Sequence, residues 1–157
     1  MTRRLAVLLA AAGSAGLLLG ALAFQYLGGL APCQMCLWQR WPHLAAILIA
    51  GLTLALPGWL WPWLGALAAA SSGAIGLFHA GVERGWWEGL TACAGGQDIG
   101  ALTPEELLAQ IMEAPLVRCD EIAWQMLGLS MAGWNAVISF VLAGLWIYAA
   151  TRPRDVT

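Results

Sequence analysis

Lysine is absent from this 157-residue sequence, and charged residues of all kinds make up only 10% of it. The seven basic residues are therefore all arginines, and the formal net charge is −2. Such a chain gives no sign of the basic surface that binds nucleic acid. Hydrophobic residues account for 61% of the sequence, whereas soluble globular domains have roughly 45–50%. The composition excludes an ordinary soluble domain and favours a membrane protein.

Four apolar stretches have the length of a membrane-spanning helix, which needs about 20 residues. They cover about residues 5–27, 37–56, 60–80 and 126–150. Glycine and proline break the chain between the first three, at Gly28-Gly29, Pro32 and Pro57-Gly58. The sequence therefore predicts a single all-α membrane domain, a bundle of four transmembrane helices in which the first three are joined by tight hairpins.

Tryptophans mark the predicted membrane boundaries, as an interfacial aromatic belt does. Nine of the ten lie near span ends, and only Trp134 falls well inside a span. The nine are Trp38, Trp41, Trp59, Trp61, Trp63, Trp86, Trp87, Trp124 and Trp146.

Arginines at both ends of the chain predict its orientation. Arg3 and Arg4 precede the first span, Arg152 and Arg154 follow the last, and the positive-inside rule assigns both pairs to the cytoplasm. The outward connections are then about residues 28–34 and 81–123, so all four cysteines face the oxidising side. The first span also resembles a signal peptide ending at 21–23, but its length and the three following spans favour a retained helix.

Two cysteines form a C-x-x-C motif, Cys33-Gln34-Met35-Cys36, at the predicted start of the second helix. Arg40 follows Cys36 by one helical turn, so both side chains lie on one face and the guanidinium can approach the sulfur. The helix N-terminus and this cation both favour a thiolate, the species that exchanges disulfides. An arginine that only extends toward lipid headgroups is the alternative reading of Arg40.

Other readings of the four cysteines stay open. A C-x-x-C is half of many zinc sites, but Cys93 and Cys119 do not form a second one and no matching histidine pair complements them. Two purely structural disulfides are also possible, although lipid and short hairpins already hold such a bundle together. We therefore expect redox chemistry and no metal.

The long connection carries Cys93 and Cys119. Glycine-rich segments at 85–89 and 94–96 predict that the chain around Cys93 is flexible or lies at the membrane interface. Cys93 would then be reachable by a soluble protein. Thr103-Pro104 and the following glutamates predict the start of a short amphipathic helix, which Pro115 ends. That helix either lies on the membrane and moves Cys119 or is a plain spacer.

These features together resemble the disulfide bond formation protein B (DsbB) family of bacterial membrane thiol:quinone oxidoreductases. A C-x-x-C-x-x-x-R element joined to two loop cysteines in a four-span chain is specific, although each part alone is weak. The resemblance rests on Phe24-Gln25, Pro32-Cys33-Gln34-Met35-Cys36, Arg40, His79, Cys93, Cys119, Trp124 and the segment Leu127-Gly128-Leu129-Ser130-Met131. One departure is Gln39, where some relatives carry an acidic residue.

The resemblance implies an electron relay at the periplasmic face of the inner membrane. A reduced thioredoxin-fold oxidase of the DsbA type would attack a Cys93–Cys119 disulfide through Cys93. Cys119 would then engage Cys33, which frees Cys36 as a thiolate beside a bound quinone. The quinone, ubiquinone or menaquinone, accepts two electrons and restores the Cys33–Cys36 disulfide. No G-x-G-x-x-G fingerprint follows a strand, so a nicotinamide or flavin site has no support.

The family's quinone pocket corresponds here to Gln25, Cys36, Arg40, His79 and Met131. Arg40 would stabilise negative charge on a quinone oxygen, and His79 would bind the other oxygen or supply a proton. His43 matches no family site, so we interpret it as a packing or capping residue. The alternative to an enzyme is a membrane scaffold or metal-handling protein whose cysteines are structural or bind metal.

Overall fold

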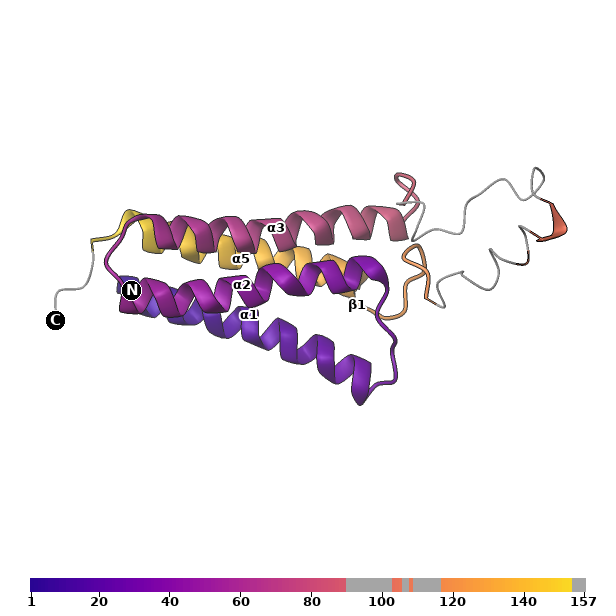
Figure 1. Cartoon of the computed structure of the whole chain (residues 1–157), viewed down its shortest axis with the longest axis horizontal. Coiled ribbons are helices and arrows are strands. Elements are labelled where there is room, and N and C mark those ends of the chain that lie inside the picture. Colours follow the sequence, from indigo (N-terminus) through magenta and orange to yellow (C-terminus); the bar gives the residue numbers. More distant parts are fainter. Residues whose placement is uncertain (90–102, 106–107, 109–116, 154–157) are drawn as a thin grey trace.

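The computed structural model describes residues 1–89, 103–105, 108 and 117–153. Four long helices form a bundle, with the start of the first helix and the end of the last at one end (Figure 1). Helix α3 packs most extensively against α5, α2 packs against α3, and α1 contacts both α2 and α5. The bounds are Arg3–Tyr26 for α1, Gln34–Ala55 for α2, Leu60–Glu83 for α3 and Met131–Thr151 for α5.

Three of these helices, α1, α3 and α5, are long and apolar enough to cross a membrane. Helix α2 has 22 residues but does not reach the same hydropathy, because Gln39, Arg40 and His43 lie in its first half. Gln39 and His43 are only 6% and 2% exposed, so the polar face of α2 points into the bundle. Its outer face carries exposed Trp41 and Leu48. Three predicted spans are confirmed, and the second remains a prediction.

The end of the bundle that holds Met1 and the α2–α3 turn is distinct from the end that holds Cys33 and Cys36. Arg3 donates a hydrogen bond to the carbonyl of Gly58 in the α2–α3 turn (3.3 Å), and the Tyr148 hydroxyl donates to the carbonyl of Met1 (2.9 Å). Figure 1 shows the α1–α2 connection, which carries Cys33, at the opposite end. Arg3 and Cys33 therefore lie on opposite sides of any membrane that the bundle crosses.

Small residues close the core near the termini around Trp146, which is 0% exposed. A Cβ atom built at Gly65 would lie 2.5 Å from the Trp146 ring, so this glycine allows α3 and α5 to approach. The prediction that Trp146 belongs to an interfacial belt is wrong, because its indole packs inward between alanine-rich helices.

The predicted start of the fourth span, at about residue 126, is also wrong. Strands β1 (Gln125–Met126) and β2 (Leu129–Ser130) form an antiparallel hairpin before α5 begins at Met131. Leu127 and Gly128 have φ values of 51° and 78°, which suits the tight turn of a two-residue hairpin. Ser130 then caps α5, since its hydroxyl accepts the Gly133 N–H (3.2 Å).

The beginning of the long connection folds back on the bundle. Arg84 donates to the carbonyl of Gly128 in the hairpin (2.8 Å), and the Trp87 indole donates to the carbonyl of Phe78 (2.9 Å). These contacts hold Arg84 and Trp87 against the bundle, in and beside the segment 85–89 that the sequence predicted to be flexible or interfacial. Of the predicted short helix, Pro104, Glu105 and Leu108 are described and are helical. The rest of it and Cys93 lie outside the described residues.

Candidate active site

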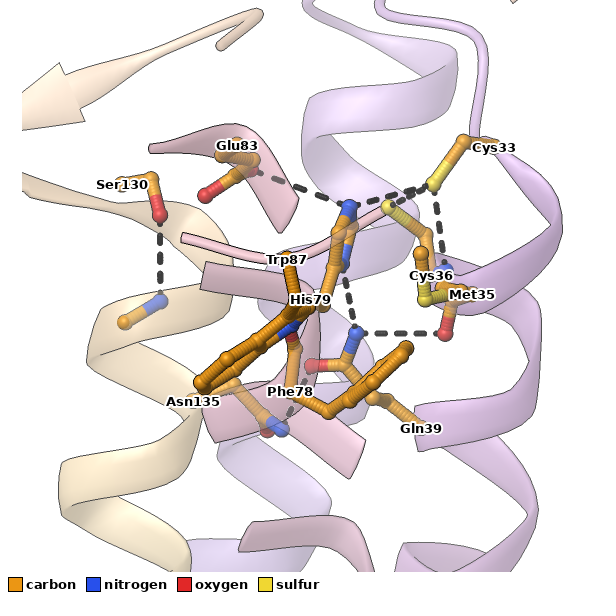
Figure 2. A network of polar contacts seen from close by, with 11 residues as sticks. Cys33, Met35, Cys36, Gln39, Phe78, His79, Glu83, Trp87, Ser130 and Asn135 are labelled. Atoms are coloured by element: carbon orange, nitrogen blue, oxygen red, sulfur yellow. Dashed lines mark hydrogen bonds and ion pairs between the residues drawn. The ribbon is translucent and has the colours of Figure 1, made fainter. Parts of the chain in front are cut away.

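The C-x-x-C motif forms the N-terminal turn of α2. Cys33 is the N-cap residue, and its sulfur accepts the Cys36 backbone N–H at 3.3 Å. The sulfur atoms of Cys33 and Cys36 are 2.9 Å apart, close together but longer than the roughly 2.05 Å of a disulfide. Figure 2 shows both sulfurs beside the His79 ring. The pair is thus a dithiol arranged to close with little movement.

The two sulfurs have different roles because of this hydrogen bond. Cys33 donates to the Cys36 sulfur, and this bond together with burial raises the pKa of Cys33 to about 12. Cys33 therefore keeps its proton at neutral pH, while Cys36 accepts a hydrogen bond from it. An accepted hydrogen bond stabilises negative charge on sulfur, so Cys36 is the better thiolate of the two.

Cys119 lies against this pair although it is 83 or more positions away along the chain. It is 0% exposed and packs in one cluster with Cys33, Met35 and Val82. Cys36 lies at the edge of the same cluster. The structure thus brings together three of the four predicted redox cysteines and leaves Cys93 outside the described residues.

His79 faces the dithiol from α3. Its Nε2 lies 3.6 Å from the Cys33 sulfur and 3.8 Å from a carboxylate oxygen of Glu83. The Gln39 amide nitrogen lies 3.0 Å from His79 Nδ1 and also donates to the carbonyl of Met35 (3.1 Å; Figure 2). Because an amide nitrogen can only donate, Nδ1 accepts and the ring proton lies on Nε2, facing Cys33.

A cavity of about 470 Å³ opens on the other side of Cys36, between α1, α2 and α5. Its volume is in the range of small-molecule sites. The wall is mostly apolar, and Cys36, Gln39, Arg40, His43 and Asn135 supply its polar groups. The remaining lining residues are Gly16, Leu17, Leu18, Gly20, Ala21, Phe24, Leu30, Ala31, Pro32, Ala123, Trp124, Met126, Met131, Ala132, Trp134 and Ile138.

Arg40 lies in the cavity wall one turn below Cys36, as the sequence predicted. Its Nη1 donates to the side-chain oxygen of Gln25 at 2.7 Å, while its buried Nε has no hydrogen-bond partner among the described residues. Arg40 thus donates its hydrogen bond to a residue of α1, whereas the Cys36 sulfur accepts a hydrogen bond from Cys33. Arg40 and Cys36 both line this cavity, and the approach of the guanidinium to the sulfur stays a prediction.

The other predicted quinone-binding residues divide into two groups. Met131, the first residue of α5, lines the cavity. Gln25 and His79 do not line it; Gln25 holds Arg40, and His79 faces Cys33. Direct contact of these two residues with a quinone stays a prediction, and the geometry gives each an indirect route to the site.

Sequence reasoning missed three polar residues of the site. His43, read as packing or capping, is 2% exposed and lines the cavity, and Gln39 and Asn135 lie beside it. Two signals were available. His43 follows Cys36 by seven positions and so shares its helix face, and Asn135 is the single asparagine of the chain, placed inside an apolar span.

The dithiol also has the ligands of a metal site. The sulfurs of Cys33 and Cys36 and a ring nitrogen of His79 all lie within 4.8 Å of one another. Thiolate and imidazole are the ligands that zinc prefers. These three residues are the part of the described chain that can hold such an ion.

Comparison with known proteins assigns the chain to a family. The family model described as disulfide bond formation protein DsbB matches residues 3–149. Disulfide bond formation protein B of Aeromonas hydrophila subsp. hydrophila is 33% identical over 152 residues, which cover 94% of this chain and 87% of that protein.

A second protein of that name, from Verminephrobacter eiseniae, is 31% identical over 137 residues, which cover 82% of this chain and 74% of the relative. The protein from Hahella chejuensis is 26% identical over 98% of both chains. No solved structure gives a significant match. The chain therefore belongs to the DsbB family, as a membrane oxidoreductase of disulfide bond formation.

Proposed function

We propose that the protein is a thiol:quinone oxidoreductase that reoxidises a periplasmic DsbA-type dithiol protein and passes the electrons to a membrane quinone. The net reaction moves two electrons and two protons. The partner's two thiols become a disulfide, and the quinone becomes a quinol. Ubiquinone and menaquinone both satisfy this balance.

The position of Cys36 is the observation that carries the proposal. Its sulfur belongs to the dithiol and also lines the apolar cavity, so electrons that reach the pair arrive at the cavity wall. The cavity fits a flat lipid-soluble ring with two oxygens, because its wall is apolar and two buried nitrogens there, Arg40 Nε and His43 Nδ1, have no partner among the described residues. A bound quinone would supply the electron acceptor, held between α1, α2 and α5.

The chain's own residues divide the work at this site. Cys36, relieved of its proton, is the sulfur that gives up electrons at the cavity. Arg40, fixed by Gln25, places a permanent positive charge where negative charge would develop on a ring oxygen. Met131 and the aromatic rings of Phe24 and Trp124, whose centroids are 5.2 Å apart, form an apolar part of the cavity wall.

His79 supports the dithiol from the opposite side. Its Nε2 proton points at the Cys33 sulfur, and Gln39 holds the ring in this tautomer. A hydrogen bond from His79 stabilises Cys33 whenever disulfide exchange leaves negative charge on that sulfur. We therefore assign His79 to the exchange between Cys119 and Cys33.

Electron entry follows from the placement of Cys119. Its burial against Cys33 supports transfer from the Cys93–Cys119 disulfide to the Cys33–Cys36 pair by thiol-disulfide exchange. The arginines at the chain termini support the assignment of the cysteine end to the periplasm and of both termini to the cytoplasm. On this orientation Cys93 meets the soluble partner and the cavity meets the inner membrane.

The direct test uses the purified full-length protein, a reduced DsbA-type protein and a short-chain ubiquinone. We expect loss of quinone absorbance in proportion to partner thiols oxidised, one quinone for each dithiol. A Cys119→Ser variant mixed with the oxidised partner should trap it as a mixed disulfide, because the free Cys93 thiol attacks the partner's disulfide and releases one partner thiol. A Cys93→Ala,Cys119→Ser variant should trap none. Absence of both quinone reduction and trapping contradicts the proposal.

The grouping of Cys33, Cys36 and His79 favours one second candidate, a metal-handling protein. Such a protein would hold a thiophilic ion at these residues and reduce no quinone. Zinc titration of the reduced protein against a competing chelator distinguishes the two. One zinc ion bound tightly, lost in Cys36→Ser and accompanied by no quinone reduction, supports the metal-handling function.

A further inference from the structure

His43 occupies a position that the proposed reaction does not yet use. It lies one helical turn beyond Arg40 on α2, is 2% exposed and forms part of the cavity wall. Its Nδ1 is one of the buried nitrogens without a hydrogen-bond partner among the described residues. The helix places Cys36, Arg40 and His43 along one face, so His43 lies at the end of the cavity away from the dithiol.

A hydrogen-bond chain across three helices fixes the donors and acceptors around His43. The Gln39 amide nitrogen is used by the Met35 carbonyl and His79, which turns the Gln39 oxygen toward Asn135. Asn135 therefore donates from its amide nitrogen to the Gln39 side-chain oxygen, at 2.7 Å. The Asn135 oxygen then faces His43 Nε2 at 3.0 Å. Figure 2 shows the section of this chain that contains Asn135, Gln39 and His79.

Two serine hydroxyls complete the environment of His43 Nε2. The Ser72 hydroxyl lies 3.0 Å from His43 Nε2 but donates its hydrogen to the carbonyl of Gln39. The Ser139 hydroxyl lies 3.3 Å from His43 Nε2 but donates its hydrogen to the Asn135 side-chain oxygen. Every neighbour of Nε2 is therefore an acceptor. A neutral imidazole in these surroundings carries its proton on Nε2 and leaves a bare lone pair on Nδ1.

We propose that His43 is a further quinone-site residue whose Nδ1 accepts a hydrogen bond from the quinol hydroxyl on the ring oxygen farther from Cys36. This inference rests on the proposed quinone function. A quinone carbonyl has no hydrogen to give, whereas a quinol hydroxyl does, so an acceptor at this place favours the reduced form. The protons balance, because the two thiols that close the Cys33–Cys36 disulfide release the two that the quinol oxygens carry.

Arg40 and His43 would therefore stabilise different states of the bound ring. Arg40 can only donate hydrogen bonds and therefore stabilises an oxygen that carries negative charge or a carbonyl. His43 accepts and therefore stabilises the oxygen once it is protonated. The two residues together favour quinol formation at opposite ends of one ring.

A pair of nearly isosteric variants tests this assignment. Asparagine at position 43 keeps a polar atom near the place of Nδ1, and glutamine keeps one near the place of Nε2. Dissociation constants of a short-chain ubiquinone and its quinol would be measured by quenching of tryptophan fluorescence, since Trp124 and Trp134 line the cavity. The protein is used with Cys33 and Cys36 oxidised and without oxygen, so that the ligands are not consumed.

For His43→Gln and for His43→Leu we expect quinol affinity to fall by roughly 3- to 10-fold relative to quinone affinity, the effect of one lost hydrogen bond. His43→Asn should retain the wild-type ratio. Ser71→Ala is the matched control, because its hydroxyl only donates to the carbonyl of Leu67 and the residue does not line the cavity, so its ratio should be unchanged.

The outcomes separate this inference from the proposed function. If His43→Gln keeps the wild-type ratio and His43→Asn loses it, His43 serves only the bond to Asn135 and the inference is overturned. Equal loss of both affinities in all His43 variants overturns it as well. If the wild-type protein binds neither ligand, the quinone function itself is wrong; if it binds both and no variant changes the ratio, only the role of His43 is wrong.

Discussion

The two ends of the bundle are built on different principles. Near the termini, alanines, Gly65 and Trp146 fill the space between α1, α3 and α5 by apolar packing. Near the cysteines the interior is polar, and Gln39, His43 and His79 are each bonded to a residue of another helix. A buried polar group is costly unless it is paired, so the second end has only a few acceptable arrangements. The first end holds the helices together, and the second sets the positions of reactive atoms.

The largest effect that separates the two ends is expected from Cys36→Ser. Loss of the sulfur at the cavity wall should reduce turnover with quinone by at least about 1,000-fold, because the group that gives up electrons is gone. Steady-state quinone reduction measures this. Gly51→Ala, a change on α2 where an added Cβ meets nothing within 4 Å, is the control. Turnover near the wild-type rate in the serine variant would remove Cys36 from the reaction.

Trp146→Ala addresses the apolar end. Removal of a fully buried indole should lower the free energy of unfolding by about 3–5 kcal/mol, while the folded fraction keeps its rate of quinone reduction. Denaturant unfolding in detergent gives the first quantity and turnover per folded protein the second. Trp63→Ala, at an exposed position of α3, should change stability much less. A specific loss of turnover in the Trp146 variant would show that the two ends are not independent.

Arg40→Ala should act on quinone use alone. Loss of the cation in the cavity wall should reduce turnover with quinone by about 100-fold. Single-turnover exchange between the soluble partner and the loop cysteines should stay intact, because Arg40 faces the cavity and not Cys119. Arg40→Lys should recover part of the rate, since the charge returns without the bond geometry that Gln25 accepts. Unchanged quinone kinetics in Arg40→Ala would exclude Arg40 from the site.

The smallest effect is expected where the hairpin meets α5. Ser130→Ala removes the N-cap of α5 and should cost about 1 kcal/mol of stability. Ser71→Ala is matched to it, because that exposed hydroxyl bonds only the carbonyl one turn earlier on α3. Thermal unfolding of the two variants makes the comparison. Equal stabilities would mean that the cap of α5 contributes nothing measurable.

Local signals in the sequence predicted much of this architecture. Apolar length and glycine or proline breaks located the helices to within a few residues, and the C-x-x-C with Arg40 located the candidate site. The hairpin before α5 was missed because Leu127 and Leu129 continue an apolar run, although Gly128 marks a turn. Trp146 was misplaced because a tryptophan near a span end is usually interfacial, and only the facing Gly65 reveals its burial.

The polar chain of the site was beyond sequence reasoning for a different reason. Gln39 lies 40 positions from His79 and 96 from Asn135, so each bond depends on how whole helices pack. Periodicity along α2 can show that Cys36, Arg40 and His43 share a face. It cannot show that α1 and α5 leave a cavity in front of them.

The hairpin before α5 limits how far Cys119 can travel. Six residue steps separate Cys119 from Gln125, the first residue of β1, and a fully extended chain of this length reaches about 20 Å. Ser130 joins the hairpin directly to α5. Cys119 is therefore connected to a fixed part of the bundle by a short segment of chain. On the proposed relay, every group with which Cys119 exchanges must come within that radius. Residues added on the N-terminal side of Cys119 should then be tolerated, whereas residues added between Cys119 and Gln125 should slow its exchange with Cys33.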